Sequence, residues 1–267
     1  GLYRSVDGGE RWAHVPGGPS GLVPVKAAVD GAGRLLVTFA NGIGPNGITR
    51  GAVWRLDGNA WVDLTPDKRA DAPAGGYMGV AVDRTHPGHL LVTTINRWQP
   101  GDTVWRSTDD GRTWEDLRER STRDVGASPF LRQGDRDAEF GHWTAGLALD
   151  PFDGRRASYT TGATVYVVDD ITASGPLRWR PWVRGIEQTA IISLCSPGAS
   201  PEGSAPLVSG FGDIAGFVHD DLGRSPPHMH LDPHLTNTNN IDWAGLTPRV
   251  LVRSGNRHAN QPVTAFH

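Results

Sequence analysis

The stretch LYRSVDGGERW at residues 2–12 recurs as VWRSTDDGRTW at residues 104–114. Both copies read Ser-x-Asp-x-Gly-x-x-Trp, and shorter or looser copies begin at residues 53 and 165. Ser and Asp side chains accept bonds from nearby backbone N–H groups in turns, and Gly takes the left-handed conformation of a tight turn. The repeat therefore predicts a β-hairpin, called an Asp-box, whose closing Trp packs between neighbouring sheets.

A second pattern runs in phase with the first. Two apolar residues precede an aspartate at three places, Asp30, Asp83 and Asp150, and an apolar or β-branched run follows each aspartate. The steps between these aspartates are 53 and 67 residues, which suits one four-stranded antiparallel blade of a β-propeller with its loops. We expect an all-β chain of about four whole blades, with part of a blade at each end.

The composition favours strands and loops over helices and excludes several classes of function. Gly occurs 35 times and Pro 20 times, and the formal net charge is −3 without a basic block. Nucleic acid is therefore not an expected partner, and no apolar run reaches membrane-spanning length. The single Cys195 cannot form a disulfide within the chain and is expected to be buried. We expect no cofactor, because phosphate-binding and paired-cysteine motifs are absent from the sequence.

Segments between the hairpins resemble the family-74 glycoside hydrolases, the xyloglucanases. The similar segments are NGIGPNGITRGAVW at 41–54, NRWQPGDT at 96–103, GHW at 141–143, GIEQTA at 185–190, GDIAGFVHDDL at 212–222 and IDWAGL at 241–246. They are collinear over nearly the whole chain. The resemblance implies a secreted, inverting enzyme with two seven-bladed propellers facing each other across a cleft for a branched β-1,4-glucan, with endo or exo action left open.

On this resemblance, residues 1–185 are the last blades of a first propeller and residues 186–267 the opening blades of a second. The family carries a catalytic aspartate in an Asp-Ile-Gly-Gly-like turn of each half. Asp213-Ile214-Ala215-Gly216 matches the second turn, with Ala in place of the first Gly. Asp213 is thus implied as the general acid, although a turn Asp that bonds only its own backbone is the alternative.

The acid requires a desolvated site, and the apolar residues flanking the turn predict one. No turn matching the family's base occurs upstream, so weak or absent catalysis by this chain alone is expected. Asp220 and Asp221 are reserve candidates, and Asp137 and Glu139 are interpreted as loop charges.

The resemblance also implies a set of substrate-binding residues. Sugar rings place their C–H faces on aromatic side chains, and two tryptophans stand in loops outside the Asp-boxes. The implied residues are Asn96, Arg97, Trp98, His142, Trp143 and His219. The expected partner is xyloglucan or a related β-glucan, together with the missing upstream half or a second copy through open strand edges.

Three other interpretations of the sequence compete with this one. The run HMHLDPH at 228–234 resembles a metal-ligand motif, but Pro233 interrupts the spacing, so a surface loop and no metal site are expected. A non-catalytic propeller serving as a binding or scaffold module is the alternative function. A sialidase is disfavoured, because no arginine triad with a nucleophilic Tyr is evident.

Overall fold

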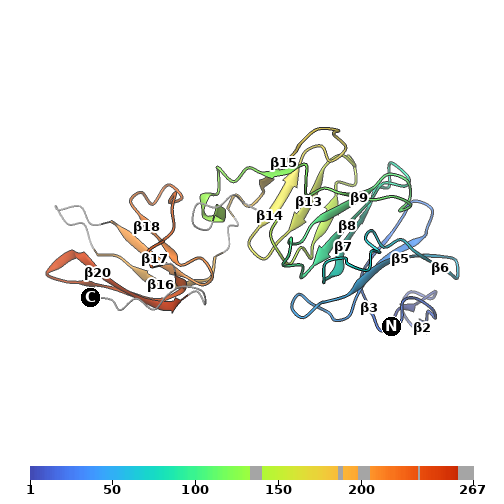
Figure 1. Ribbon diagram of the computed structural model, residues 1–267, viewed down its shortest axis with the longest axis horizontal. Helices are drawn as coiled ribbons and strands as arrows, with labels where there is room; N and C mark the ends of the chain where they lie inside the picture. Colours follow the sequence, from blue (N-terminus) through green and yellow to red (C-terminus); the bar gives the residue numbers. More distant parts are fainter. Residues whose placement is uncertain (133–139, 186–188, 198–204, 234, 258–267) are drawn as a thin grey trace. The chain divides into compact units, whose positions relative to one another are not determined.

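The structure, a computed structural model, describes residues 1–132, 140–185, 189–197, 205–233 and 235–257. Its regular elements are strands apart from one 3-10 turn, η1 (Pro129–Arg132). The chain divides into two compact units (Figure 1). The first unit comprises residues 1–123 and 139–183, and the second comprises 124–138 and 184–267. No helix among the described residues is long and apolar enough to cross a membrane.

The first unit contains three sheets and a hairpin. The hairpin pairs β1 (Tyr3–Arg4) with β2 (Ala13–His14). The first sheet has β3 (Val23–Val29), β4 (Leu35–Ala40), β5 (Gly51–Asp57) and β6 (Ala60–Asp63). The second has β7 (Gly76–Val82), β8 (Leu90–Ile95), β9 (Val104–Ser107) and β10 (Glu115–Asp116). The third has β12 (Leu147–Leu149), β13 (Ala157–Thr160), β14 (Val165–Val168) and β15 (Leu177–Pro181). Each sheet is an antiparallel meander in chain order, as the repeat predicts.

The second repeated pattern occupies the same place in each of these sheets. The aspartates Asp30, Asp83 and Asp150 directly follow the first strand of each sheet and precede the second. Each carboxylate accepts bonds from backbone N–H groups two to four residues further on. The repeated Asp therefore closes the first turn of a blade, because its short side chain satisfies donors that the turn leaves free.

The Asp-boxes form the predicted hairpin contacts. Gly9 N donates to Ser5 Oγ at 2.8 Å, and Arg11 N donates to Asp7 Oδ1 at 3.0 Å. The second box repeats both bonds at 2.9 Å, from the corresponding glycine and threonine to Ser107 and Asp109. These carboxylates serve the turn, and their hydrogen bonds hold the pKa of Asp109 down at about 2.

The closing tryptophans behave differently in the two boxes. Trp114 packs against a core cluster drawn from the first and second sheets, including Leu36, Val53 and Tyr77, so it locks neighbouring blades as predicted. The same prediction is wrong for Trp12, which is 63% exposed. Within the described residues its hairpin pairs only with itself, so no neighbouring sheet covers the ring.

A fifth strand that the sequence did not indicate completes the third sheet. Strand β11 (Ser121–Arg123) pairs in parallel with β15 at the outer edge. Ser121 Oγ accepts a bond from the fully buried Trp179 Nε1 at 3.1 Å, and Arg123 Nε donates to Tyr159 Oη at the same distance. The Arg123 guanidinium also lies 3.4 Å from the centre of the Phe140 ring. The strand is thus held by polar contacts with an aromatic core.

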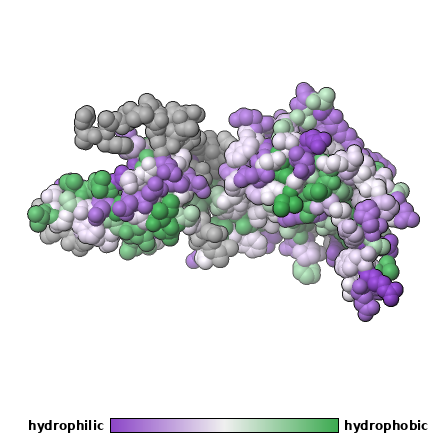
Figure 2. Space-filling model, turned by 90° about the horizontal axis from the view of Figure 1, so that it is seen from below, coloured by the Kyte–Doolittle hydropathy of each residue, from purple (hydrophilic) through white to green (hydrophobic). Residues whose placement is uncertain are grey.

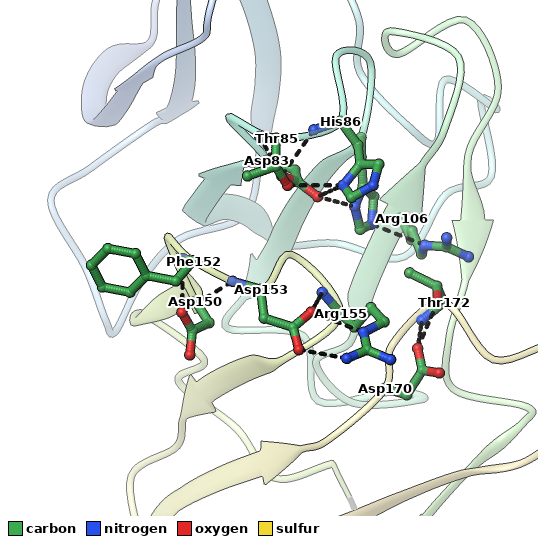
Figure 3. A network of polar contacts seen from close by, with 11 residues as sticks. Asp83, Thr85, His86, Arg106, Asp150, Phe152, Asp153, Arg155, Asp170 and Thr172 are labelled. Atoms are coloured by element: carbon green, nitrogen blue, oxygen red, sulfur yellow. Dashed lines mark hydrogen bonds and ion pairs between the residues drawn. The ribbon is translucent and has the colours of Figure 1, made fainter.

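A polar network stabilises the turns at the Asp-box edge of this unit (Figure 3). The Asp83 side chain is 2% exposed and lies 3.0 and 3.2 Å from Nδ1 of His86 and His89. His89 Nε2 accepts a bond from Arg106 Nε at 3.0 Å, so its proton resides on Nδ1 and points to Asp83. Burial opposes ionisation of Asp83, but hydrogen bonds from Thr85 and the histidines hold its pKa below the usual range. This network is structural.

The second unit contains a three-stranded sheet and a long hairpin. The sheet has β16 (Ile191–Cys195), β17 (Leu207–Phe211) and β18 (Gly216–His219), and the hairpin has β19 (Leu235–Ala244) and β20 (Thr247–Arg257). The expectation of about four whole blades therefore exceeds the three that the described residues form. Cys195 is buried, as predicted. Several apolar side chains of this unit are exposed on the strands, and Figure 2 shows apolar residues on one of its faces.

Candidate functional site

Loops from all three sheets of the first unit meet at one edge. Because the sheets are meanders, the β4–β5 loop (41–50) and the β8–β9 loop (96–103) lie at the edge opposite the Asp-box turns. Asn96 Nδ2 donates to Ile48 O at 2.9 Å and so joins these two loops. The segment before β12 joins these loops because Trp143 N donates to Asp102 Oδ2 at 2.7 Å. The loop between β13 and β14 joins that segment, since Gly162 N donates to His142 O at 3.0 Å. One edge therefore collects chain from three blades.

Three aromatic side chains gather at this edge. The Trp98 ring is stacked on His142, with centroids 4.9 Å apart and an interplanar angle of 30°. Trp143 stands edge-on to Trp98, at 6.4 Å and 80°. Trp98 is 57% exposed, whereas Trp143 packs against the buried core of the unit. The structure thus brings together three of the predicted substrate-binding residues as an aromatic cluster with one open ring.

Two other predicted binding residues occupy supporting positions. Arg97 is 5% exposed, and its guanidinium carbon lies 5.5 Å from the centre of the Tyr77 ring. This buried side chain packs beneath the loop, and a contact of Arg97 with a ligand stays a prediction. Asn96 accepts a bond from Trp98 Nε1 at 3.1 Å in addition to its contact with Ile48. Its amide therefore orients the exposed tryptophan.

The predicted acid lies in the second unit, in the turn between β17 and β18. Asp213 and Ala215 both have left-handed backbone conformations, with φ of 68° and 55°. Asp213 N donates to Asn237 Oδ1 at 2.8 Å, and Gly212 N donates to Ala190 O at 2.8 Å. These bonds to β19 and to the residue before β16 hold an uncommon turn in place.

The surroundings of Asp213 differ from the expected desolvated site. Phe211, Ile214 and Phe217 form a buried cluster with Met229, but Asp213 itself is exposed. The apolar neighbours point into the core, so within the described residues of this unit they do not shield the carboxylate.

The reserve candidate Asp221 is a turn residue. Its Oδ1 accepts a bond from Gly223 N at 2.8 Å, and its Oδ2 lies 3.3 Å from Arg224 Nε. These contacts match the interpretation of the acidic pair as a solvated turn. Asp137 and Glu139 lie outside the described residues.

His219, predicted to bind substrate, lies on β18 and is half-buried. Its Nε2 is 2.8 Å from Ser209 Oγ on the neighbouring strand β17. Burial lowers its pKa, so the neutral imidazole is favoured and can donate to or accept from the serine hydroxyl. The second unit thus presents Asp213 and His219 from the same β17–β18 element.

The histidine-rich run borders a pocket in the second unit. The pocket has a volume of about 490 Å³ and is lined by apolar residues that include Val208, Ile241 and Leu251. Its polar lining residues are the reserve candidate Asp220 together with His230, Asp232, Arg249 and Arg253. Asp213 does not line it, so the pocket and the predicted acid are separate features. Among the described residues no group of three or more His, Cys, Asp or Glu side chains could hold a metal ion, and His234 lies outside them.

We predict that acidification destabilises the second unit through His230. Burial and the nearby Arg253 lower the pKa of His230 to about 4, whereas the pKa of an unfolded histidine is about 6.5. Between these values the unfolded chain binds the extra proton, so stability falls as the pH drops from about 6.5 to about 4. Chemical unfolding should therefore show that the free energy of unfolding falls less between pH 7 and pH 5 in His230→Asn than in the wild type. Equal losses would contradict this assignment.

Comparisons with known proteins identify the family. No family model matches the chain. A xyloglucanase from Paenibacillus sp. is 38% identical over 275 residues, covering 95% of this chain and 26% of its own length. The crystal structure of the GH74 xyloglucanase from Xanthomonas campestris superimposes with a TM-score of 0.84 at 34% identity, covering 97% of this chain and 36% of that one.

The chain is a homologue of the GH74 xyloglucanases. The GH74 enzyme from Niastella koreensis has the same fold, with a TM-score of 0.80 at 26% identity, covering 95% of this chain and 36% of that one. The chain therefore spans about a quarter to a third of the length of these GH74 proteins. The predicted all-β propeller-blade architecture is confirmed by these structures and by the four-stranded sheets.

Proposed function

We propose that this chain belongs to a glycoside hydrolase that cleaves the β-1,4-glucan backbone of xyloglucan. The observation that carries the proposal is the 38% identity to a xyloglucanase across 95% of the chain. The three-blade edge with its exposed tryptophan supports it, because such a ring can receive the C–H face of a sugar. Residues 1–185 and 186–267 are assigned to a first and a second propeller, and the extracellular location follows from the same proposal.

In the proposed reaction Asp213 acts as the general acid. Its protonated carboxyl donates to the glycosidic oxygen while the bond from that oxygen to the anomeric carbon breaks. A second carboxylate takes a proton from water, and the water oxygen attacks the anomeric carbon from the opposite face. Inversion of this kind needs roughly 6.5–9.5 Å between the two carboxyls to admit the water. No described residue is assigned as that base.

The turn geometry supports this role for Asp213. Its main-chain N–H is bonded to Asn237 and its side chain is exposed, so the carboxyl is free to meet a substrate while the backbone is fixed. A positioned acid must be held by groups other than the one that reacts. Desolvation would then come from the bound polysaccharide, because water leaves the carboxyl when the substrate covers it.

Replacing Trp98 by Ala tests the substrate-binding surface. We expect the affinity for a xyloglucan oligosaccharide to fall at least about tenfold, which corresponds to about 1.4 kcal/mol, because the open ring is lost. Titration calorimetry measures the change. Trp182 is the matched control, since it lies in the same unit with an almost equal exposure of 56%, against 57% for Trp98. An equal loss in Trp182→Ala, or no loss in Trp98→Ala, would argue against this surface.

A further inference from the structure

Asp102 is a buried carboxylate that the proposed mechanism does not use. It is 0% exposed, and it lies in the β8–β9 loop only a few residues after Trp98. Removing a charge from water is costly unless hydrogen bonds replace the lost hydration. The contacts that Asp102 makes should therefore indicate why a carboxylate is kept here.

The two carboxylate oxygens serve two different loops. Oδ1 accepts from Arg97 N at 3.0 Å and from Thr94 Oγ1 at 3.1 Å. Oδ2 accepts from Trp143 N at 2.7 Å and from Thr144 N at 3.4 Å. The first loop carries Trp98, and the second carries the His142-Trp143 pair. One side chain thus joins loops of the second and third sheets at the base of the aromatic cluster.

The backbone at both loops is uncommon and depends on such support. Asn96 and Trp143 each have a φ of 60°. A bulky aromatic residue rarely adopts this left-handed conformation. The bond from Trp143 N to Asp102, at 2.7 Å, satisfies this partly buried backbone donor. Strained backbone held by surrounding contacts is typical of functional sites.

We propose that Asp102 is a positioning residue that fixes Trp98 and the His142-Trp143 pair in the mutual orientation of the sugar-binding surface. The consequence for ligand binding rests on the proposed function. A neutral amide cannot replace the carboxylate, because an Asn at this position would turn its NH₂ group toward one of the two pairs of donors. The carboxylate is therefore expected to be required for the shape of the surface as well as for its stability.

The experiment compares Asp102→Asn with Asp109→Asn. Asp109 is a matched control because the same substitution there removes a structural carboxylate from the same sheet, in the Asp-box turn at its opposite edge. Fluorine NMR of the fluorotryptophan-labelled chain reports the surroundings of Trp98 and Trp143, with Trp182 reporting that the unit is folded. Calorimetry with a xyloglucan oligosaccharide reports affinity.

In Asp102→Asn we expect shifted or broadened Trp98 and Trp143 resonances, an unchanged Trp182 resonance and at least a tenfold loss of affinity. Asp109→Asn should leave those two resonances unchanged and the affinity within about twofold. Unchanged Trp98 and Trp143 resonances in a folded Asp102→Asn chain would overturn the proposal. If the wild type binds no oligosaccharide but the resonances still move, the proposed function fails while the positioning role stands.

A second variant guards against loss of folding. Thr94→Val removes one donor to Asp102 Oδ1, together with the acceptor of Thr103 N, and leaves the carboxylate in place. It should shift the Trp98 resonance in the same direction as Asp102→Asn, by a smaller amount. A Trp98 resonance identical to that of the wild type would contradict the role assigned to Asp102.

Discussion

Replacing Asp213 by Asn is expected to lower the rate of xyloglucan hydrolysis by about 10²–10⁴-fold, the usual contribution of a general acid. Asn tolerates the left-handed backbone found here, with φ of 68°, so the turn should be retained. The measurement is made with whichever form of the polypeptide hydrolyses xyloglucan, this chain alone or this chain within a longer one. A dinitrophenyl glycoside, whose leaving group departs without protonation, should be cleaved by the variant at nearly the wild-type rate.

Asp221→Asn provides the matched control for that prediction. Asp221 is an exposed acid of the same unit whose contacts are those of a turn, so its loss should change the rate by less than about twofold. A larger loss of rate in Asp221→Asn than in Asp213→Asn would assign the general acid to Asp221. If Asp213→Asn hydrolysed xyloglucan and the dinitrophenyl glycoside with equally reduced rates, the residue would have a structural role in the turn.

Replacing Gly216 by Ala is expected to destabilise the second unit by about 3–5 kcal/mol, from backbone strain and steric overlap together. Its φ is 137°, which L-residues avoid, and a Cβ there would lie 1.9 Å from Ser209 O. The overlap is with backbone of the paired strand β17, which cannot move without breaking the ladder. Trp243 is the only one of the ten tryptophans in residues 184–267, so its fluorine resonance reports unfolding of this unit in urea.

Gly212→Ala is the control at the other end of the same turn. A Cβ at Gly212 would meet its nearest neighbour, Ala190 Cβ, at 3.4 Å, an ordinary contact. This variant should unfold within about 1 kcal/mol of the wild type. Similar unfolding of both variants would mean that the close approach at Gly216 is not a constraint of the fold.

Much of the fold could be predicted from sequence because the repeat has a local physical basis. A Ser, an Asp and a Gly at fixed spacing close a turn through contacts within five residues, and such contacts are readable without knowledge of the partner strands. The features that were missed depend on distant chain. Trp12 is exposed because its hairpin has no neighbouring sheet among the described residues, and strand β11 is too short to show a pattern of its own.

In the candidate site, too, some features could be predicted from the local sequence and others depend on distant parts of the chain. The tryptophans of the loops outside the Asp-boxes were found because they fit no strand pattern, and the structure brings Trp98 and Trp143 together. The burial of Arg97 and the contacts of Asp102 could not be predicted, since they depend on Tyr77 and on a loop 41 residues further along the chain.

The most direct test of the central claim is calorimetric titration of the folded chain with xyloglucan oligosaccharides, with cellohexaose and sialyllactose titrated alongside. The account predicts selective binding of the xyloglucan ligands, weakened in Trp98→Ala and retained in Trp182→Ala. Absence of binding by a demonstrably folded chain would contradict the claim and favour a propeller segment with a scaffold role.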